Sequence, residues 1–268
     1  MNGVKVGIIG IGNMGSAHLR MITGGNIPDM TVTAVCDIDT KKLNAARNTY
    51  PALSVFEDYT DLLKNSDTNA VIIAVPHPLH AKIAIEAFKY GKHVLVEKPL
   101  DITVSAAEDL CAAAEKSGKV FAIMFNQRTN GLFRKAREIV KSGELGEIKR
   151  SVWIITNWYR TQSYYDSGSW RATWAGEGGG VLLNQAPHNL DIWQWICGSP
   201  SAVTAFCSVG KFHNIEVEDE ATIYAEYENG ATGVFITSTG DCPGTNRLEI
   251  TGTRGKLVLE NGILKLWK

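Results

Sequence analysis

The sequence predicts an α/β protein in which a doubly wound parallel sheet is followed by a second, α+β domain. Up to about residue 121, short apolar runs alternate with amphipathic helical patterns, which is typical of parallel strands joined by crossover helices. After Asn126, a helix and a long strand lead into further strands separated by short turns such as Glu228-Asn229-Gly230, which favour antiparallel hairpins. We therefore expect one domain at 1–123 and a second at 124–268.

The individual elements follow from these patterns in chain order. In the first domain we expect strands at 4–9, 32–36, 70–75, 93–96 and 119–123, and helices near 14–22, 39–48, 58–65, 79–90 and 103–117. In the second domain we expect a helix near 131–142, a strand near 148–157, an irregular stretch to Gly180, a helix to Ile196, and strands near 202–210, 221–228, 231–238, 246–251 and 255–260. The chain stops in what looks like one more strand, so we expect the second domain to be truncated at its C-terminus.

Composition narrows the class of protein. The chain has 268 residues, 44% of them hydrophobic, and its 27 basic and 28 acidic side chains give a net charge of −1. This balance offers no electrostatic footprint for nucleic acid or an anionic membrane, and no apolar run approaches the ~18 residues of a membrane span. The first strand starts too early to leave room for a signal sequence, so we expect a cytoplasmic protein with a small-molecule ligand.

The cysteines indicate neither a disulfide framework nor a zinc site. They are odd in number, scattered and without C-x-x-C spacing. We expect reduced thiols in or near the core at Cys36, Cys111, Cys197, Cys207 and Cys242.

Three glycines open the first helix directly after the first strand. Gly10 permits a tight turn, Gly12 lets the backbone approach a pyrophosphate, and Gly15 allows close packing of helix on strand, while the amides at the helix start face the phosphate charge. Asp37 closes the second strand, where it can accept hydrogen bonds from a ribose diol. The context predicts a dinucleotide site. It favours NAD over NADP, because a 2′-phosphate beside a carboxylate is repelled, although Lys41 and Lys42 could hold that phosphate.

A charged pair and a proline end the strand at 93–96. Glu97 and Lys98 lie at the carboxyl end of a parallel strand, where the nucleotide crevice is expected, and Pro99 forces the chain out of the sheet. A lysine at this position can bind a substrate hydroxyl and stabilise negative charge on its oxygen.

Several motifs together make a family resemblance specific: Gly10-x-Gly12-x-x-Gly15, Gly91-Lys92-His93-Val94-x-x-Glu97-Lys98-Pro99, Asn126-x-Arg128, and Gly178-Gly179-Gly180 followed by His188 and Asp191. On these motifs, over essentially its whole length, the chain resembles the glucose–fructose oxidoreductase / inositol dehydrogenase / MocA (Gfo/Idh/MocA) family. The resemblance implies a Rossmann-type domain followed by a domain with an open, mostly antiparallel sheet. It also implies an NAD-dependent dehydrogenase that oxidises a secondary alcohol of a sugar, sugar acid or inositol-like polyol, with Lys98 and His188 as the catalytic pair.

His188 is the expected general base, because an imidazole that titrates near neutrality suits removal of the hydroxyl proton. Positions 184, 188 and 191 would share one helical face, so Asn184, His188 and Asp191 can line one wall. Many family members carry aspartate where this chain has Asn184. Asparagine cannot hold a proton in transit, so we assign Asn184 to substrate binding.

Other ligand contacts come from an aromatic and arginine-rich stretch and from the resemblance. Rings can cover the C–H side of a sugar, and arginine can bind hydroxyls or a carboxylate. We expect packing against the second sheet or a subunit interface to account for more than half of the aromatic rings between residues 153 and 174. We expect substrate contacts from Arg128, Asn184, Tyr159, Trp170 and Arg171, and cofactor contacts from Gly10, Ile11, Gly12, Asn13, Met14, Gly15, Asp37, Pro76, His80, Glu97 and Lys98.

Further expectations concern other charged groups and assembly. No third ligand accompanies His77 and His80, so we expect no metal site. The acidic run 216–220 alternates like a strand edge and is expected to be solvated, and His18, His93 and His213 are expected to be structural. A sheet covered on one face only predicts a homodimer or homotetramer formed through the C-terminal sheet.

Two other functions stay open at this point. One is a glycosidase that uses NAD for transient oxidation of its substrate, and the other is a non-catalytic NAD(P)-sensing regulator on the same fold.

Overall fold

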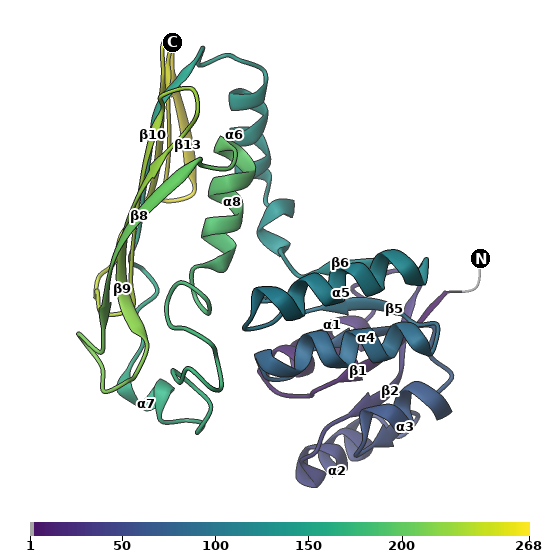
Figure 1. Ribbon diagram of the computed structural model, residues 1–268. Helices are drawn as coiled ribbons and strands as arrows, with labels where there is room; N and C mark the ends of the chain where they lie inside the picture. The colour runs from purple at the N-terminus through teal and green to yellow at the C-terminus, as the bar shows by residue number, and fades with distance from the viewer. Residues whose placement is uncertain (1–2) are drawn as a thin grey trace. The chain divides into compact units, whose positions relative to one another are not determined.

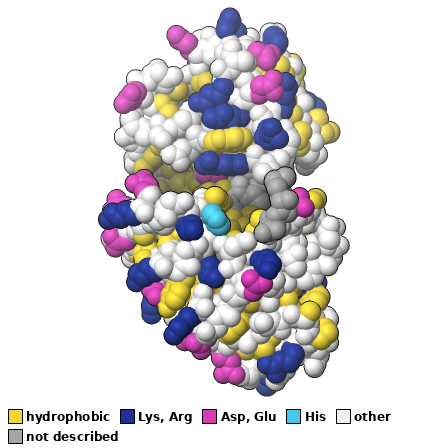
Figure 2. Space-filling model, turned by 90° about the vertical axis from the view of Figure 1, so that its right-hand side faces the viewer, with side chains coloured by type: hydrophobic (Ala, Val, Ile, Leu, Met, Phe, Trp, Pro, Cys, Tyr) yellow, Lys and Arg dark blue, Asp and Glu magenta, His cyan; other side chains and the backbone are white. Residues whose placement is uncertain are grey.

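The computed structural model describes residues 3–268, and the chain divides into two compact units, Met1–Met124 and Phe125–Lys268. Figure 1 labels the helices and strands of both units. On the face drawn in Figure 2, basic and acidic side chains are both scattered over the surface, which agrees with the near-zero net charge. Within residues 3–268, no helix combines the length and the apolar character needed to cross a membrane.

The first unit is a parallel sheet with helices on both faces, as the sequence predicts. Among its described residues the strand order is β3-β2-β1-β4-β5-β6, and every strand pairing is parallel. The strands are β1 (Val4–Ile9), β2 (Met30–Cys36), β3 (Ser54–Phe56), β4 (Ala70–Ile73), β5 (His93–Val96) and β6 (Phe121–Ile123). The helices are α1 (Asn13–Thr23), α2 (Thr40–Thr49), α3 (Tyr59–Asn65), the short 3₁₀ helix η1 (His77–Leu79), α4 (His80–Lys89) and α5 (Val104–Ser117).

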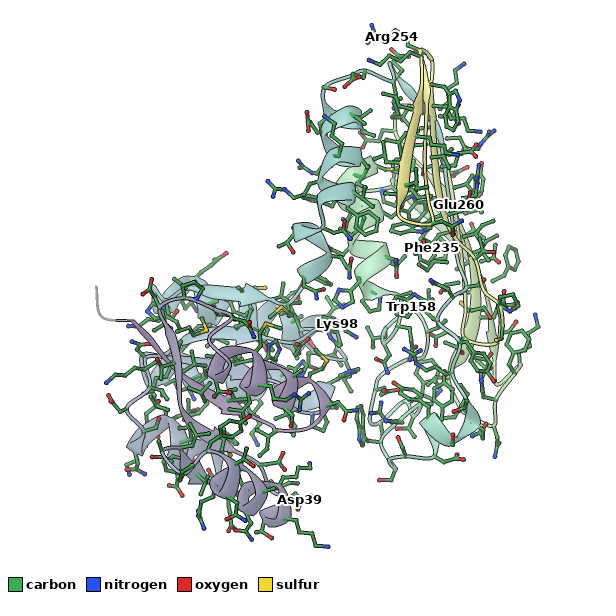
Figure 3. All side chains as sticks on the ribbon, turned by 180° about the vertical axis from the view of Figure 1, so that it is seen from behind. Asp39, Lys98, Trp158, Phe235, Arg254 and Glu260 are labelled. Carbon is green, nitrogen blue, oxygen red and sulfur yellow. The ribbon has the colours of Figure 1, made fainter. Side chains whose placement is uncertain are left out.

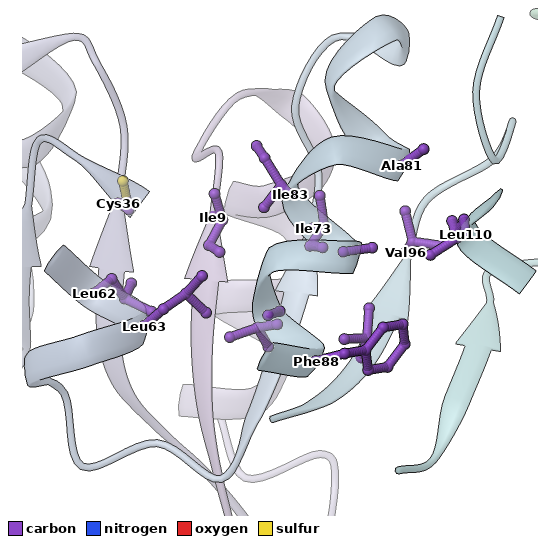
Figure 4. Close-up of a cluster of buried hydrophobic side chains, with 14 of the residues drawn as sticks. Ile9, Cys36, Leu62, Leu63, Ile73, Ala81, Ile83, Phe88, Val96 and Leu110 are labelled. Atoms are coloured by element: carbon purple, nitrogen blue, oxygen red, sulfur yellow. The ribbon is translucent and has the colours of Figure 1, made fainter. Parts of the chain in front are cut away.

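Two apolar layers hold this sheet between its helices. Leu19 and Ile22 of α1, with Leu43 of α2, pack on one face of the sheet. Helices α3, α4 and α5 cover the other face through a cluster that includes Leu62, Phe88 and Leu110 (Figure 4). Strand order reverses between β1 and β4, so the carboxyl ends of these strands border the crevice in which such sheets bind ligands. The sequence did not predict β3, because its three residues are too few to show a period.

The second unit is an open, mostly antiparallel sheet, in agreement with the predicted fold class. Its strand order among the described residues is β13-β12-β11-β7-β10-β9-β8, and only the β7–β10 pairing is parallel. The strands are β7 (Ile148–Ile155), β8 (Ala202–Val209), β9 (Glu218–Glu226), β10 (Thr232–Ser238), β11 (Asn246–Gly252), β12 (Lys256–Glu260) and β13 (Ile263–Trp267). The helical segments are η2 (Asn126–Thr129), α6 (Gly131–Lys141), α7 (Gln162–Tyr165) and α8 (Pro187–Cys197).

Helices α6 and α8 cover one face of this second sheet (Figure 1). Trp153 and Phe235, both fully buried, form the centre of the core, with ring centroids 6.1 Å apart. Phe133 of α6 and Trp193 of α8 pack on these two rings at 5.7 and 5.5 Å (Phe235 is labelled in Figure 3). Strand register places Phe206, Tyr224 and Trp267 on the opposite face of the sheet, where each side chain is exposed.

The expectation that all the thiols lie in or near the core is wrong for three of them. Cys36 is buried and Cys197 is half-buried, but Cys111, Cys207 and Cys242 are exposed. Burial raises the pKa of the Cys36 thiol to about 12, and the neighbouring Asp37 carboxylate adds to the rise.

Candidate active site

The turn between β1 and α1 has the geometry of a phosphate cradle. Gly10 has φ +87°, and a Cβ there would lie 2.5 Å from the carbonyl oxygen of Ala74. A Cβ on Gly15 would lie 1.8 Å from the oxygen of Gly10, so both positions require glycine. By contrast, a Cβ on Gly12 would meet nothing within 4 Å, so the backbone there borders open space.

Helix α1 begins at this turn, and in the described part of the chain no side chain caps its N-terminus. Its first amides therefore point at the open space beside Gly12, and they can bind the pyrophosphate of a dinucleotide. The predicted cofactor contacts Asn13 and Met14 are exposed here, whereas Ile11 is buried.

Asp37 lies at the end of β2, against the glycine turn. Its Oδ2 accepts a hydrogen bond from the amide of Ile11 at 2.9 Å, and its Oδ1 accepts one from the amide of Asp39 at 2.9 Å. The Lys42 Nζ is 3.5 Å from both carboxylate oxygens, so it offsets part of their charge. These contacts hold the carboxylate beside the cradle, in a position suited to a ribose diol.

Ile38 is a residue that the sequence analysis missed. Its side chain is 92% exposed immediately after Asp37, so it offers an apolar surface beside that carboxylate. The adenine ring of a dinucleotide is a ligand of the right kind. The signal in the sequence was an apolar residue that follows the strand-ending acid.

The Glu97-Lys98-Pro99 turn leaves the sheet at the end of β5 (Lys98 is labelled in Figure 3). Lys98 is half-buried. The Glu97 side chain is buried, and its Oε1 lies 2.7 Å from the Nε2 of His18 in α1. The turn is therefore held by contacts from elsewhere in the same unit.

His80 differs from the expected cofactor contact. Its side chain is only 1% exposed, with Nδ1 2.6 Å from the carbonyl oxygen of Pro99 and Nε2 2.8 Å from that of Val75. Each ring nitrogen thus lies against a backbone oxygen, a neutral imidazole donates to one of the two, and the ring has no surface left for a ligand. Burial lowers the pKa of His80, although both carbonyls and the nearby Glu97 and Asp101 act in the opposite direction.

In the second unit, His188 and Asp191 lie on α8, but Asn184 does not. Helix α8 begins at Pro187, which suits the first helical position because its missing N–H needs no partner there. Asn184 lies in the turn before the helix, where its backbone N–H donates to the carbonyl oxygen of Gly180 at 2.9 Å. The expectation of a helical face shared by all three residues is therefore wrong for Asn184. His188 is half-buried in the first turn of α8, edge-on to the ring of Phe125 at 6.0 Å.

A buried carboxylate that the sequence analysis did not single out orients Asn184. Glu177 is 1% exposed, its Oε2 accepts a hydrogen bond from the amide of Ala172 at 2.7 Å, and its Oε1 accepts one from the Asn184 side-chain Nδ2. A carboxylate only accepts hydrogen bonds, so this contact identifies which amide atom of Asn184 is the nitrogen. The amide oxygen of Asn184 then points away from Glu177.

The predicted cations are already engaged by protein groups. Arg128 forms a forked ion pair with Asp191, with Nε–Oδ2 at 2.8 Å and Nη2–Oδ1 at 2.5 Å. Arg171 donates to the hydroxyl of Tyr164 at 2.9 Å, stacks on Trp170 and lies 3.9 Å from Glu177, so that only 16% of its side chain is exposed. Of the predicted aromatic contacts, Tyr159 is exposed and Trp170 is half-buried.

A cavity of about 670 Å³ lies beside Arg171 in this unit. Its lining is mostly polar and comes from two segments, 165–173 and 214–216.

The acidic run 216–220 was expected to be solvated, and this expectation is wrong for Glu218 and Asp219, which are buried. Glu218 accepts hydrogen bonds from the amides of Gly180 and Leu182, at 2.9 and 3.0 Å. Asp219, fully buried, accepts hydrogen bonds from three successive backbone amides, those of residues 211–213. Both carboxylates satisfy amides of segments that lack regular secondary structure, a role that alternation along a strand does not reveal.

Comparison with known families identifies both units. Residues 4–125 match the model of an oxidoreductase family with an NAD-binding Rossmann fold. Residues 133–258 match the model of the GFO/IDH/MocA C-terminal domain. Together the two matches span most of the chain.

Individual oxidoreductases and dehydrogenases are also similar to this chain. The oxidoreductase YrbE of Bacillus subtilis is 29% identical over 96% of this chain and 74% of its own length. The myo-inositol 2-dehydrogenase of Thermotoga maritima is 24% identical over 96% of this chain and 75% of its own length. Among solved structures, the WlbA dehydrogenase of Chromobacterium violaceum, in complex with NADH and UDP-GlcNAcA, superimposes with a TM-score of 0.92. That structure is 26% identical in sequence, and the match covers 100% of this chain and 78% of WlbA.

Proposed function

This chain belongs to the Gfo/Idh/MocA oxidoreductase family, and on that premise we propose that it transfers a hydride between NAD and a secondary alcohol of a sugar, sugar acid or inositol-like polyol. The family models confirm the resemblance read from the motifs, the NAD-binding Rossmann domain and the class of enzyme, a dehydrogenase acting on CH–OH groups. The identity of the alcohol and the residues that act on it are our proposal.

One observation carries the proposal. Lys98 follows β5 in the same parallel sheet in which the glycine turn follows β1 and Asp37 follows β2. Parallel strands end at one edge of their sheet, so the lysine and the dinucleotide cradle share that edge. A lysine beside a nicotinamide site is suited to act on the alcohol that is oxidised there.

The residues divide the chemistry between them. NAD, when bound, supplies the hydride acceptor, and the first-turn amides of α1, Asp37 and Ile38 hold it. His188 removes the proton of the substrate hydroxyl, and the ammonium of Lys98 stabilises the negative charge that develops on the oxygen.

Substrate recognition is assigned to the second unit. Asn184 presents its amide oxygen to a substrate hydroxyl, since its nitrogen is taken by Glu177. Tyr159 and Trp170 offer ring faces to the C–H side of a sugar, with Arg128 and Arg171 as polar contacts. Relatives named as inositol 2-dehydrogenase and levoglucosan dehydrogenase, and the WlbA complex with UDP-GlcNAcA, support a carbohydrate or cyclitol substrate.

We also propose that the enzyme prefers NAD to NADP, because the Asp37 carboxylate repels a 2′-phosphate. A cytoplasmic location belongs to the same proposal, because thiols such as the exposed Cys111, Cys207 and Cys242 stay reduced there. Recovery of the protein with the exported fraction of the cell would contradict the location.

Residues 124–268 are proposed as a domain for substrate binding and for assembly. The sheet face opposite α6 and α8 exposes Phe206, Tyr224 and Trp267, which favours association through that face into a dimer or tetramer. Light scattering at micromolar concentration tests this. A monomer alone would contradict the proposal, as would a dimer that persists in Phe206→Asp.

The direct test of the reaction is NAD reduction measured against a panel of inositols, aldoses and uronates. Turnover of at least one secondary alcohol supports the proposal. Release of the glycone from a chromogenic glycoside without net NAD reduction would indicate the glycosidase instead. Tight NAD binding with no turnover on any member of the panel would indicate a regulator.

A further inference from the structure

Two buried histidines grip the residues on either side of Lys98. On one side, His18 Nε2 lies 2.7 Å from the Glu97 carboxylate, and the two side chains are 11% and 10% exposed. On the other side, His80 Nδ1 lies 2.6 Å from the carbonyl oxygen of Pro99. Residues 97 and 99 are thus each hydrogen-bonded to a histidine from another element.

The two histidines come from helices on opposite faces of the sheet. His18 is a buried residue of α1, the helix that starts at the glycine turn and packs on the sheet face that α2 also covers. His80 begins α4, and its Nε2 reaches the carbonyl oxygen of Val75 at 2.8 Å, just beyond β4. The 97–99 turn is therefore tied to the phosphate cradle from one face and to the neighbouring strand from the other.

We propose that His18 and His80 are positioning residues that fix the direction in which Lys98 leaves the backbone. The proposal rests on the catalytic role assigned to Lys98 above. Lysine carries its charge on a flexible four-carbon stem, so the ammonium is placed accurately only if the backbone at its root is held. Small displacements of a reacting group have large effects on rate, of roughly 100-fold for about 1 Å.

The chemistry of the two contacts suggests paired substitutions with opposite expectations. The side-chain amide of asparagine reaches the place of a histidine Nδ1, and that of glutamine reaches the place of Nε2. His80→Asn therefore keeps the bond to Pro99, whereas His80→Gln keeps only the bond to Val75. At His18 the order is reversed, since the contact to Glu97 uses Nε2 and is kept by His18→Gln but not by His18→Asn.

The proposal predicts a crossed pattern in kcat. His80→Gln and His18→Asn should lower kcat roughly 10- to 100-fold, and His80→Asn and His18→Gln should each lower it clearly less. The dissociation constant of NAD should stay within about twofold in all four variants, because the cradle amides are untouched. His93→Gln is the matched control. His93 is the first residue of β5, the strand that precedes Lys98, and its Nδ1 accepts a hydrogen bond from the amide of Val120 at 2.9 Å. The substitution removes an Nδ1 contact away from the 97–99 turn, so it should leave kcat unchanged.

A second readout does not need a substrate. Lysines methylated with isotope-labelled formaldehyde give separate NMR signals, and the Lys98 signal is identified by its loss in Lys98→Ala. It should shift or broaden in His80→Gln and His18→Asn and stay near its wild-type position in the other two variants.

Equal losses of kcat for both substitutions at each site, or losses that follow the fraction of folded protein, would overturn the positioning role. A Lys98 NMR signal that neither shifts nor broadens in any of the four variants would overturn it as well. Full kcat in Lys98→Ala is a different outcome. It would refute the proposed function of Lys98 and leave the contacts of the two histidines with the 97–99 turn in place.

Discussion

The two units hold the side chains that we propose for the site by different means. In the first unit, Lys98 follows a strand of a sheet that is packed on both faces, and two histidines secure the turn. In the second unit, Asn184 lies in a segment without regular secondary structure, and its surroundings depend on the buried carboxylates Glu177 and Glu218.

This difference follows from where backbone amides find their acceptors. In a sheet with helices, the amides are satisfied by neighbouring strands and turns, so apolar packing can fix the geometry. In the segment before α8, backbone carbonyls accept from some amides, as at Asn184, but the amides of Gly180 and Leu182 donate to the Glu218 carboxylate instead. Hydrogen bonds to a charged acceptor are strong enough to offset the cost of burying it. The geometry of this segment therefore depends on a few individual charges.

The largest expected effect lies in the first unit. Lys98→Ala should reduce kcat by at least the roughly 10²–10⁴-fold loss typical of removing a proton-transfer group, because it removes a charge from the site at which an alkoxide develops. The NAD dissociation constant should change little, which calorimetry can check. A variant that binds NAD poorly but turns over normally once saturated would show that Lys98 serves only to hold the cofactor.

His188→Ala tests the corresponding residue of the second unit. We expect a loss in kcat of roughly 10²–10⁴ with unchanged NAD affinity, since the imidazole acts on the substrate proton. Steady-state kinetics on the best substrate measures it. More than about a third of the wild-type kcat would be too much activity for an enzyme without its base, and His188 would then be structural.

Glu218→Ala tests whether carboxylates hold the second unit together. It leaves the buried amide of Gly180 and the half-buried amide of Leu182 without their acceptor, so the free energy of unfolding should fall by about 2–3 kcal/mol. Urea denaturation followed by fluorescence measures it. Glu216→Ala, in the same acidic run but exposed, is the control and should change stability by less than about 0.5 kcal/mol. Equal effects of the two variants would refute the distinction.

Lys42 should weaken the preference for NAD, and its removal should have a smaller effect than the changes above. It is partly exposed and only 3.5 Å from both oxygens of Asp37, so Lys42→Ala should widen the preference for NAD over NADP by about 2- to 5-fold. Lys41→Ala, one residue away, should not. Dissociation constants of both cofactors decide the matter, and a wild-type protein that binds NADP more tightly than NAD contradicts the preference itself.

The final prediction concerns pH in the first unit. Burial lowers the pKa of His80 below its usual 6.5, so below that pH the unfolded chain binds a proton more readily than the folded one. The stabilisation is complete above pH 6.5 and is lost as the pH falls from there through the folded pKa. Denaturation midpoints between pH 7.5 and 5 should therefore fall less steeply in His80→Gln than in the wild type. A steeper fall in the variant would mean that the two carbonyls hold His80 protonated.

Local patterns in the sequence were sufficient for most of the fold and for the outline of the site. Apolar periodicity is a property of neighbouring residues, so the longer helices and every strand except β3 could be predicted, whereas the short helical segments η2 and α7 could not. Glycines with defined spacing and a lysine after a strand indicate a dinucleotide crevice, because the chemistry of a turn or a strand end is also local.

Only the tertiary structure decided which polar groups are buried and what they hold. His18 and Glu97 are 79 residues apart in the chain, and Gly180 and Glu218 are 38 apart, so no local pattern connects them. An acid or a histidine in the sequence looks the same whether water or a distant backbone amide is its partner. Folding makes that choice, because a buried polar group needs an acceptor or donor that the neighbouring segments do not provide.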